Sequence, residues 1–339
     1  MKKMIKQIVI YAVIAIFSIA LISCNDSAVN NSTSIPQDNF MIYAWDYSDS
    51  HYFVDTLYRR SFTEYYSDSM TTYVISNSII ESPTQPLEVW VQCDVTNVDK
   101  RFCVGKVMLE ARPSQGYDTS VTNPEIILGE KYAGYFRKLL PSEFYHNNLA
   151  GFIGLNISVP ENYHVGVVYQ NYSSQIFGRG YMESLPTDTI ILKLFKVDNQ
   201  SPDLTPLAWE LKMKNVYKMP FTNLQTSTTI KTKFILNYNY YDTLIGYTTP
   251  LITMLKLDRV NNTTLLPPPD GKFDWLAGKT IFPAEGYLVF PTLEPFGKDL
   301  QLMPNDSNYC YFELYSQRKS NAQISNKASY YAIKGNAVY

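Results

Sequence analysis

The pattern of apolar and polar positions predicts β-strands through most of this chain. Leu87–Gln92 alternates apolar and polar side chains, which is typical of a strand with one buried face. Turn residues such as Pro267–Gly271 separate the apolar segments. The pattern predicts a mostly β fold, antiparallel and sandwich-like, with long loops and little helix. The other expected strands are Lys106–Leu109, Phe152–Ile157, Val165–Tyr169, Ile190–Phe195, Thr232–Tyr238, Thr253–Leu257, Tyr287–Phe290 and Tyr311–Tyr315.

Helical periodicity is scarce. Trp209–Tyr217 fits either a short helix or a strand, and Pro141–Tyr145 fits one helical turn. The polar segment Asp198–Pro206, which contains two prolines, interrupts the pattern of apolar runs. We therefore expect a first β module over 40–200 and a second over 201–339, with the option that the two pack as one domain.

The N-terminus has the features of an export signal. Three lysines lie among the first six residues, and residues 8–22 are almost entirely apolar. This pattern predicts a signal peptide over 1–23. Leu21–Cys24 resembles the lipobox of bacterial lipoproteins, so Cys24 is expected to carry a lipid, with residues 24–39 as a flexible tether. An ordinary cleaved signal or an uncleaved anchor is the alternative.

Composition and charge exclude two classes of protein. The chain is 45% hydrophobic, 14% aromatic and only 18% charged, which is too apolar for a disordered protein. Its formal net charge of −2 provides no basic field for nucleic acid. The same charge provides no attraction to anionic lipid. The lipid on Cys24 is therefore expected to supply the attachment to the outer membrane, on either its periplasmic or its cell-surface face.

Two cysteines are candidates for a disulfide in an oxidising compartment. Cys93 ends one strand-like segment, and Cys103 lies at the start of the next. The link between the two segments contains Asn97, so the cysteines could lie opposite each other across a hairpin. Two buried free thiols are the alternative. No Cys/His spacing matches a zinc site.

The sequence does not predict an enzyme. It has no nucleophile elbow, no glycine-rich phosphate loop and no paired-histidine metal helix. The three histidines are the only imidazole bases, and His146 and His164 are expected at the surface or at a strand edge.

One loop-rich stretch is a candidate calcium site. Asp258, Asp270 and Asp274 lie close together in sequence with two asparagines between them. Clustered oxygen ligands suit Ca²⁺, but the spacing departs from the EF-hand pattern. Because Asp and Asn also favour turns for local reasons, a purely structural loop is the alternative.

Several runs together resemble a known family. Asp270–Gly278 is followed by Gly286–Gly297, which contains Phe-Pro-Thr-Leu-Glu-Pro-Phe-Gly. These residues resemble the SprA/Sov family, the outer-membrane translocon of type IX secretion and gliding motility in Bacteroidota. Further runs look like motifs of that family in the same order: Leu87–Gln92, Ala150–Asn156 with His164–Tyr169, Leu192–Leu194 with Trp209–Tyr217, and Tyr311–Tyr315 with Ala332–Gly335.

The resemblance implies a soluble β module of such a translocon rather than its barrel. It implies an accessory or partial component, non-enzymatic, with type IX secretion or gliding components as partners. A stand-alone lipoprotein and one part of a split translocon both fit. The aromatic residues expected to serve as core or partner contacts are Trp90, Trp209, Phe273, Trp275 and Phe296.

The rival hypothesis is an envelope lipoprotein that binds a glycan or a peptide through an aromatic-lined surface. The Asn/Tyr-rich segment Asn237–Asp242 is where such a surface is expected. A solvent-facing strand is the preferred interpretation of the same segment.

Overall fold

The computed structural model describes residues 36–67, 79–80, 85–117, 130–181, 184–300, 302, 306–324 and 329–339. The predicted signal peptide, Cys24 and most of the tether lie outside these residues. Gln37–Tyr339 forms one compact unit. Within the described ranges, no helix is both long and apolar enough to cross a membrane.

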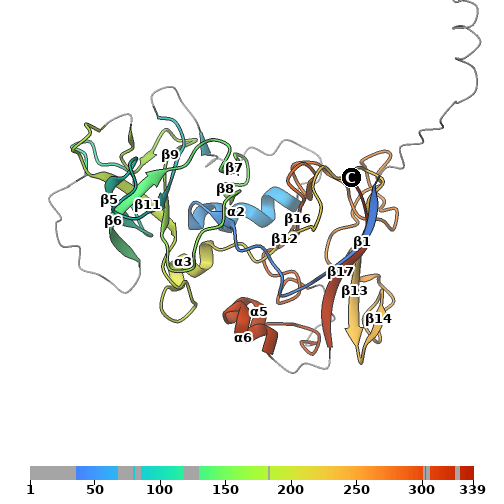
Figure 1. The fold of residues 1–339 in the computed structure, drawn as a ribbon. Helices are drawn as coiled ribbons and strands as arrows, with labels where there is room; N and C mark the ends of the chain where they lie inside the picture. The colour runs from blue at the N-terminus through green and yellow to red at the C-terminus, as the bar shows by residue number, and fades with distance from the viewer. Residues whose placement is uncertain are drawn as a thin grey trace, which may run out of the picture. The chain divides into compact units, whose positions relative to one another are not determined.

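Five strands close into a small barrel: β4 (Glu88–Gln92), β5 (Arg101–Lys106), β6 (Lys131–Lys138), β9 (Val165–Asn171) and β11 (Ile190–Lys196). Strand β4 pairs antiparallel with both β6 and β9, and β9 pairs antiparallel with β11. Strand β11 lies parallel to β5, which pairs antiparallel with β6 and completes the ring. Figure 1 shows β5, β6, β9 and β11 gathered in one region. Two short strands extend β9, namely β3 (Ile79–Ile80) and β10 (Ile176–Phe177).

The barrel interior is narrow because glycines let strands approach. A Cβ atom on Gly105 would lie 2.5 Å from the Leu194 side chain, and one on Gly166 would lie 2.9 Å from Cβ of Leu192. Every residue of β11 is buried, as expected for a strand covered on both faces.

A second, open sheet contains four strands in the order β1 (Gln37–Tyr43), β17 (Ser329–Val338), β13 (Thr229–Leu236) and β14 (Asn239–Tyr241). Its register joins the two ends of the described chain, since Gln37 lies opposite Val338. These strands run side by side in Figure 1. One face packs into a hydrophobic cluster through Ile42, Phe234 and Ile333.

Two small antiparallel sheets and five short helices complete the described fold. One sheet has the order β2 (His51–Phe53), β8 (Phe152–Leu155), β7 (Phe144–Asn147), and the other β12 (Val216–Lys218), β16 (Tyr287–Val289), β15 (Ile281–Phe282). The helices are α2 (Thr56–Ser67), α3 (Pro206–Leu211), α4 (Leu251–Met254), α5 (Glu313–Ser316) and α6 (Lys319–Ile324).

The expected module boundary near residue 200 does not separate two cores. The hydrophobic cluster around the barrel includes Val216 and Tyr287 from the second expected module. The cluster under the open sheet includes Phe40 and Tyr47 from the first. The two expected modules therefore share their cores.

The mostly β prediction is confirmed, and several strands fall where they were expected, among them β4, β8, β9, β11 and β16. Three expected strands are wrong. Lys106–Leu109 overlaps β5 only at Lys106, where that strand ends. Thr253–Leu257 overlaps helix α4, and Tyr311–Tyr315 overlaps helix α5. Trp209–Tyr217 contains both predicted alternatives, because α3 ends within it and β12 begins there.

The expected Cys93–Cys103 hairpin is wrong, and both residues are free thiols. Strand β6 lies between their strands: the Cys93 N–H donates to the Tyr135 carbonyl, and Cys103 lies opposite Gly134. Because Tyr135 and Gly134 are consecutive, the residues beside them, Cys93 and Cys103, direct their side chains to opposite faces of the sheet. The intervening strand and this alternation keep the sulfurs apart.

Candidate functional site

The open sheet borders a groove of about 900 Å³. Consecutive residues Thr226–Thr232 line it, and they belong to β13 and the segment before it. Because successive side chains of a strand point to opposite faces, a cavity on one face would contact only alternate residues. The groove therefore runs along the edge of β13.

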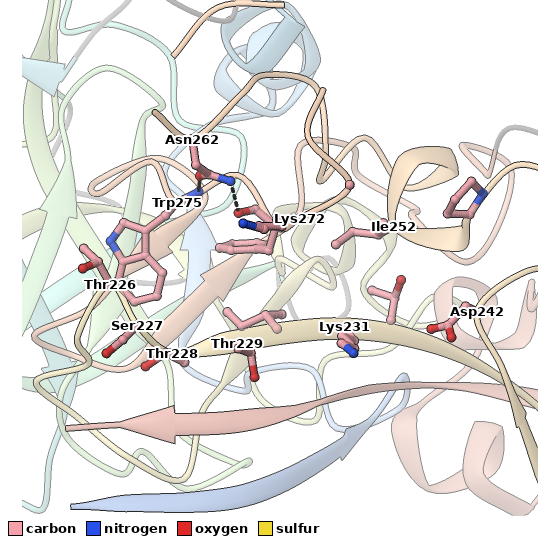
Figure 2. Close-up of a pocket in the computed structure, with 15 residues that line it drawn as sticks. Thr226, Ser227, Thr228, Thr229, Lys231, Asp242, Ile252, Asn262, Lys272 and Trp275 are labelled. Atoms are coloured by element: carbon pink, nitrogen blue, oxygen red, sulfur yellow. Dashed lines mark hydrogen bonds between the residues drawn. The ribbon is translucent and has the colours of Figure 1, made fainter. Parts of the chain in front are cut away.

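This edge is free over half of the strand. Strand β14 pairs only with Phe234–Leu236, whereas Thr229–Lys233 pairs only with β17. Figure 2 shows β13 with two strands on one side and the side chains of the far wall on the other. The first half of β13 therefore presents an unpaired strand edge to the groove.

The register of the hairpin identifies the backbone groups that face the groove. Asn237 and Tyr238 both have positive φ, which defines a two-residue type I′ turn closed by hydrogen bonding between Leu236 and Asn239. Hydrogen-bonded and non-bonded pairs alternate along an antiparallel ladder. The N–H and C=O groups of Ile230 and Thr232 therefore point away from β17 and toward the groove.

A buried hydroxyl also lies at this edge. Thr232 lines the groove and is only 2% exposed. Its Oγ1 has no hydrogen-bond partner in the described part of the chain. An unsatisfied buried hydroxyl is costly in free energy, which makes this position receptive to a polar ligand atom.

The far wall of the groove is apolar and rigidly supported. It includes Ile252 from α4, together with Phe273 and Trp275 from the loop that follows. Asn262 fixes that loop, because its Oδ1 accepts the Trp275 N–H at 2.9 Å and its Nδ2 donates to the Phe273 carbonyl at 3.0 Å (Figure 2).

The charges along the groove are mainly positive. Asp242 accepts a hydrogen bond from Lys233 Nζ at 2.6 Å and is thereby neutralised. Lys231 and Lys272 also line the groove. Neither ammonium group has an ion-pair or hydrogen-bond partner among the described residues. The groove thus has two cations without a direct ion-pair partner among these residues, and the charge of Lys272 also acts on Asp270 at longer range.

The three candidate calcium ligands support the groove loop through amide hydrogen bonds. Asp274 accepts the N–H groups of Arg259 and Val260, and Asp258 accepts the N–H of Gly271 at 3.2 Å. Asp270 accepts the N–H of Asn262 at 3.1 Å. Within the described ranges, no three metal-binding side chains converge. A calcium site therefore stays a prediction from the sequence alone.

The five candidate aromatic contacts divide into two groups. Trp90, Trp209 and Phe296 are buried in the hydrophobic core. Phe273 is also mostly buried but lines the groove, and Trp275 is half-buried beside it. The structure thus places two of the five at the groove. Of the segment Asn237–Asp242, Asn239–Tyr241 forms strand β14, as the preferred interpretation has it, and Tyr238 lies in the turn before it, 89% exposed.

The sequence reasoning missed a buried histidine beside a second, polar cavity of about 580 Å³. Ser48, which lines that cavity, places its Oγ 2.6 Å from Nδ1 of fully buried His51, and the Tyr145 hydroxyl bonds with Nε2. Burial, assisted by the charge of Lys218, lowers the pKa of His51 to about 3. Such an imidazole is a poor base at neutral pH, so the arrangement does not activate the serine.

His164 was expected at the surface or at an edge, and this is wrong. It is 5% exposed, stacks on Tyr132 with 4.0 Å between ring centroids, and its Nδ1 lies 2.8 Å from Gln92 Oε1. Burial, with the nearby charge of Lys196, lowers the pKa of His164 to about 4. The ring therefore packs as a neutral core residue.

No family model matches the chain, and no curated protein matches it either. The groove geometry and the sequence patterns therefore carry the functional argument.

Proposed function

We propose that this chain is a non-enzymatic, lipid-anchored binding protein of the outer membrane, and that its ligand occupies the groove along β13. The observation that carries the proposal is the coincidence of an unpaired strand edge, an unsatisfied buried hydroxyl on Thr232 and an aromatic wall in one groove. Concave, mostly apolar sites with a few convergent polar groups are the usual form of binding sites. Lipidation at Cys24 would hold the groove at the membrane.

A second candidate function concerns the machinery that the protein serves. The run Asp270–Gly278, which resembles part of the SprA/Sov family, contributes Lys272, Phe273 and Trp275 to the groove. The resemblance and the groove thus share residues. On this ground we propose a type IX secretion or gliding component as the source of the ligand.

Photo-crosslinking in living cells tests the binding function. A benzophenone amino acid replaces Trp275 in the groove, and a control protein carries the same group at Val98, a 92% exposed residue. We expect an adduct from position 275 that is absent from position 98. Equal labelling at both positions, or none at position 275, would overturn the groove as a ligand site.

Mass spectrometry of the adduct tests the second candidate. A type IX secretion or gliding protein would support it, and an unrelated partner would reject it while leaving the binding function intact. A Cys24→Ser variant tests the anchor, because it should move the protein from the membrane fraction to the soluble fraction. Retention in the membrane would contradict lipid attachment at Cys24.

A further inference from the structure

We infer that the groove binds an extended, acidic peptide segment, which pairs with the free half of β13 as an additional strand. This inference rests on the proposed binding function and names the chemical class of the ligand. Strand addition to an exposed sheet edge is a recurring mode of peptide recognition. Main-chain hydrogen bonds give affinity in this mode, and pockets for alternate side chains give specificity.

The first argument is that the groove follows a strand edge. It contacts consecutive residues of Thr226–Thr232, including both faces of β13. Another strand is the ligand whose backbone can satisfy such an edge along its length. Thr229–Lys233 extends about 17 Å at the usual rise per residue, which accommodates a peptide of about five residues.

The second argument concerns individual donors and acceptors. Ile230 and Thr232 direct their N–H and C=O groups into the groove, as the alternation of the ladder requires. No other backbone group among the described residues bonds with them. The unsatisfied Thr232 Oγ1 lies beside the same edge and supplies a further hydrogen bond to an incoming polar group.

The third argument concerns side chains. Alternate residues of an added strand would project toward Ile252 and Phe273, which form an apolar surface. Lys231 and Lys272, which have no direct ion-pair partner among the described residues, favour acidic residues elsewhere on the peptide. Edge lysines also oppose pairing with a second copy of the same edge, because Lys231 of the two copies would repel.

The test uses peptides selected from a phage-displayed library of random dodecamers on the mature chain carrying Cys24→Ser. The strongest peptide is synthesised and its Kd measured by fluorescence anisotropy. It is then remade with single N-methyl groups on successive backbone amides. This modification removes one donor at a time and leaves the fold of the protein untouched.

We expect the selected peptides to be rich in Asp and Glu. N-methylation should weaken binding at least about tenfold at alternate amides and by less than about twofold at the amides between them, because only alternate groups of an added strand face β13. Lys272→Glu should weaken binding about tenfold, whereas Lys106→Glu, on β5 of the barrel, should leave the Kd within about twofold.

Three results would overturn the inference: N-methylation without an alternating pattern, equal binding to the Lys272→Glu protein, or a dimer through β13 that excludes the peptide. The cellular crosslinking separates this inference from the proposed function. An adduct at position 275 that contains no peptide would reject the peptide ligand and retain the binding function, whereas no adduct would reject both.

Discussion

The barrel and the open sheet differ in whether the edges of their strands are paired. In the barrel, β4 pairs with both β6 and β9, so the ring closes and leaves no free lateral edge within it. In the open sheet, β14 covers only Phe234–Leu236 and leaves Thr229–Lys233 unpaired on one side. The closed ring pairs both sides of each of its strands, whereas the open sheet leaves backbone groups of β13 unpaired among the described residues.

Two buried polar groups show a related contrast, although the Tyr58 hydroxyl in the barrel's cluster also lacks a partner among the described residues. In the barrel region, Lys193 forms an ion pair with Asp55 at 2.8 Å and also donates to the Val107 carbonyl. At the open sheet, Thr232 Oγ1 has no partner among the described residues. The sheet edge with this unpartnered hydroxyl is where we propose that a ligand binds.

The largest effect is expected from the buried ion pair. Asp55→Asn keeps an oxygen acceptor for the Leu57 N–H but removes the charge that compensates Lys193. Leaving a buried charge unpaired should lower the free energy of unfolding by about 3–5 kcal/mol. Urea denaturation measures this change. The double variant Asp55→Asn/Lys193→Met keeps that acceptor, serves as the control and should recover most of the loss; no loss in the single variant would contradict the account.

Acid should destabilise the fold through its buried histidines. The pKa of His51 is about 3 in the folded state, below its unfolded value of about 6.5, so the unfolded state binds more protons between these values. The free energy of unfolding should therefore fall as the pH drops from 6.5, by about 3 kcal/mol at pH 4 for His51. Denaturation at several pH values measures the fall. An NMR titration in which the His51 ring protonates near pH 6.5 would reject this assignment.

A smaller effect is expected from filling the barrel. Gly105→Val would place Cβ 2.5 Å from Leu194, and overpacking of this kind costs about 1–3 kcal/mol. Thr229→Ser, on the exposed face of β13, is the matched control: it keeps the hydroxyl that accepts the Asn336 N–H and should change stability by less than about 0.5 kcal/mol. Equal losses in the two variants would mean that the barrel is no more tightly packed than the open edge.

The smallest effect on stability should accompany a clear effect on binding. Thr232→Val removes the unsatisfied hydroxyl while nearly conserving volume, so the free energy of unfolding should stay the same or rise by about 0.5–1 kcal/mol. Binding of the selected peptide should weaken. Thermal unfolding and anisotropy measure the two quantities on one sample. A marked loss of stability would show that the hydroxyl is satisfied in the folded protein.

The elements that could be predicted from the sequence are those with a clear local pattern of apolar residues. Strands β4, β9 and β11 were found because their apolar residues form continuous or alternating runs. Helix α2 was missed, although Tyr58 and Phe62 lie four residues apart on its buried side and Asp55 accepts the Leu57 N–H at its start. The four-residue helices α4 and α5 are too short to show a periodic signal.

The groove could be predicted only in part. Phe273 and Trp275 were singled out as contacts, and Asn237–Asp242 was recognised as strand-like. The free edge itself depends on β17 lying between β1 and β13, with Met41 opposite Lys334 and Lys334 opposite Lys231. Such pairings join residues far apart in the chain, and no local pattern encodes them.

Hydrogen exchange at single-residue resolution along β13 tests the central claim most directly. In the unliganded protein, the amides of Ile230 and Thr232 should exchange much faster than those of Lys231 and Lys233, because only the latter bond with β17. The selected peptide should slow the exchange of Ile230 and Thr232. Uniform protection of all four amides in the unliganded protein would show that this edge is already occupied and would contradict the account.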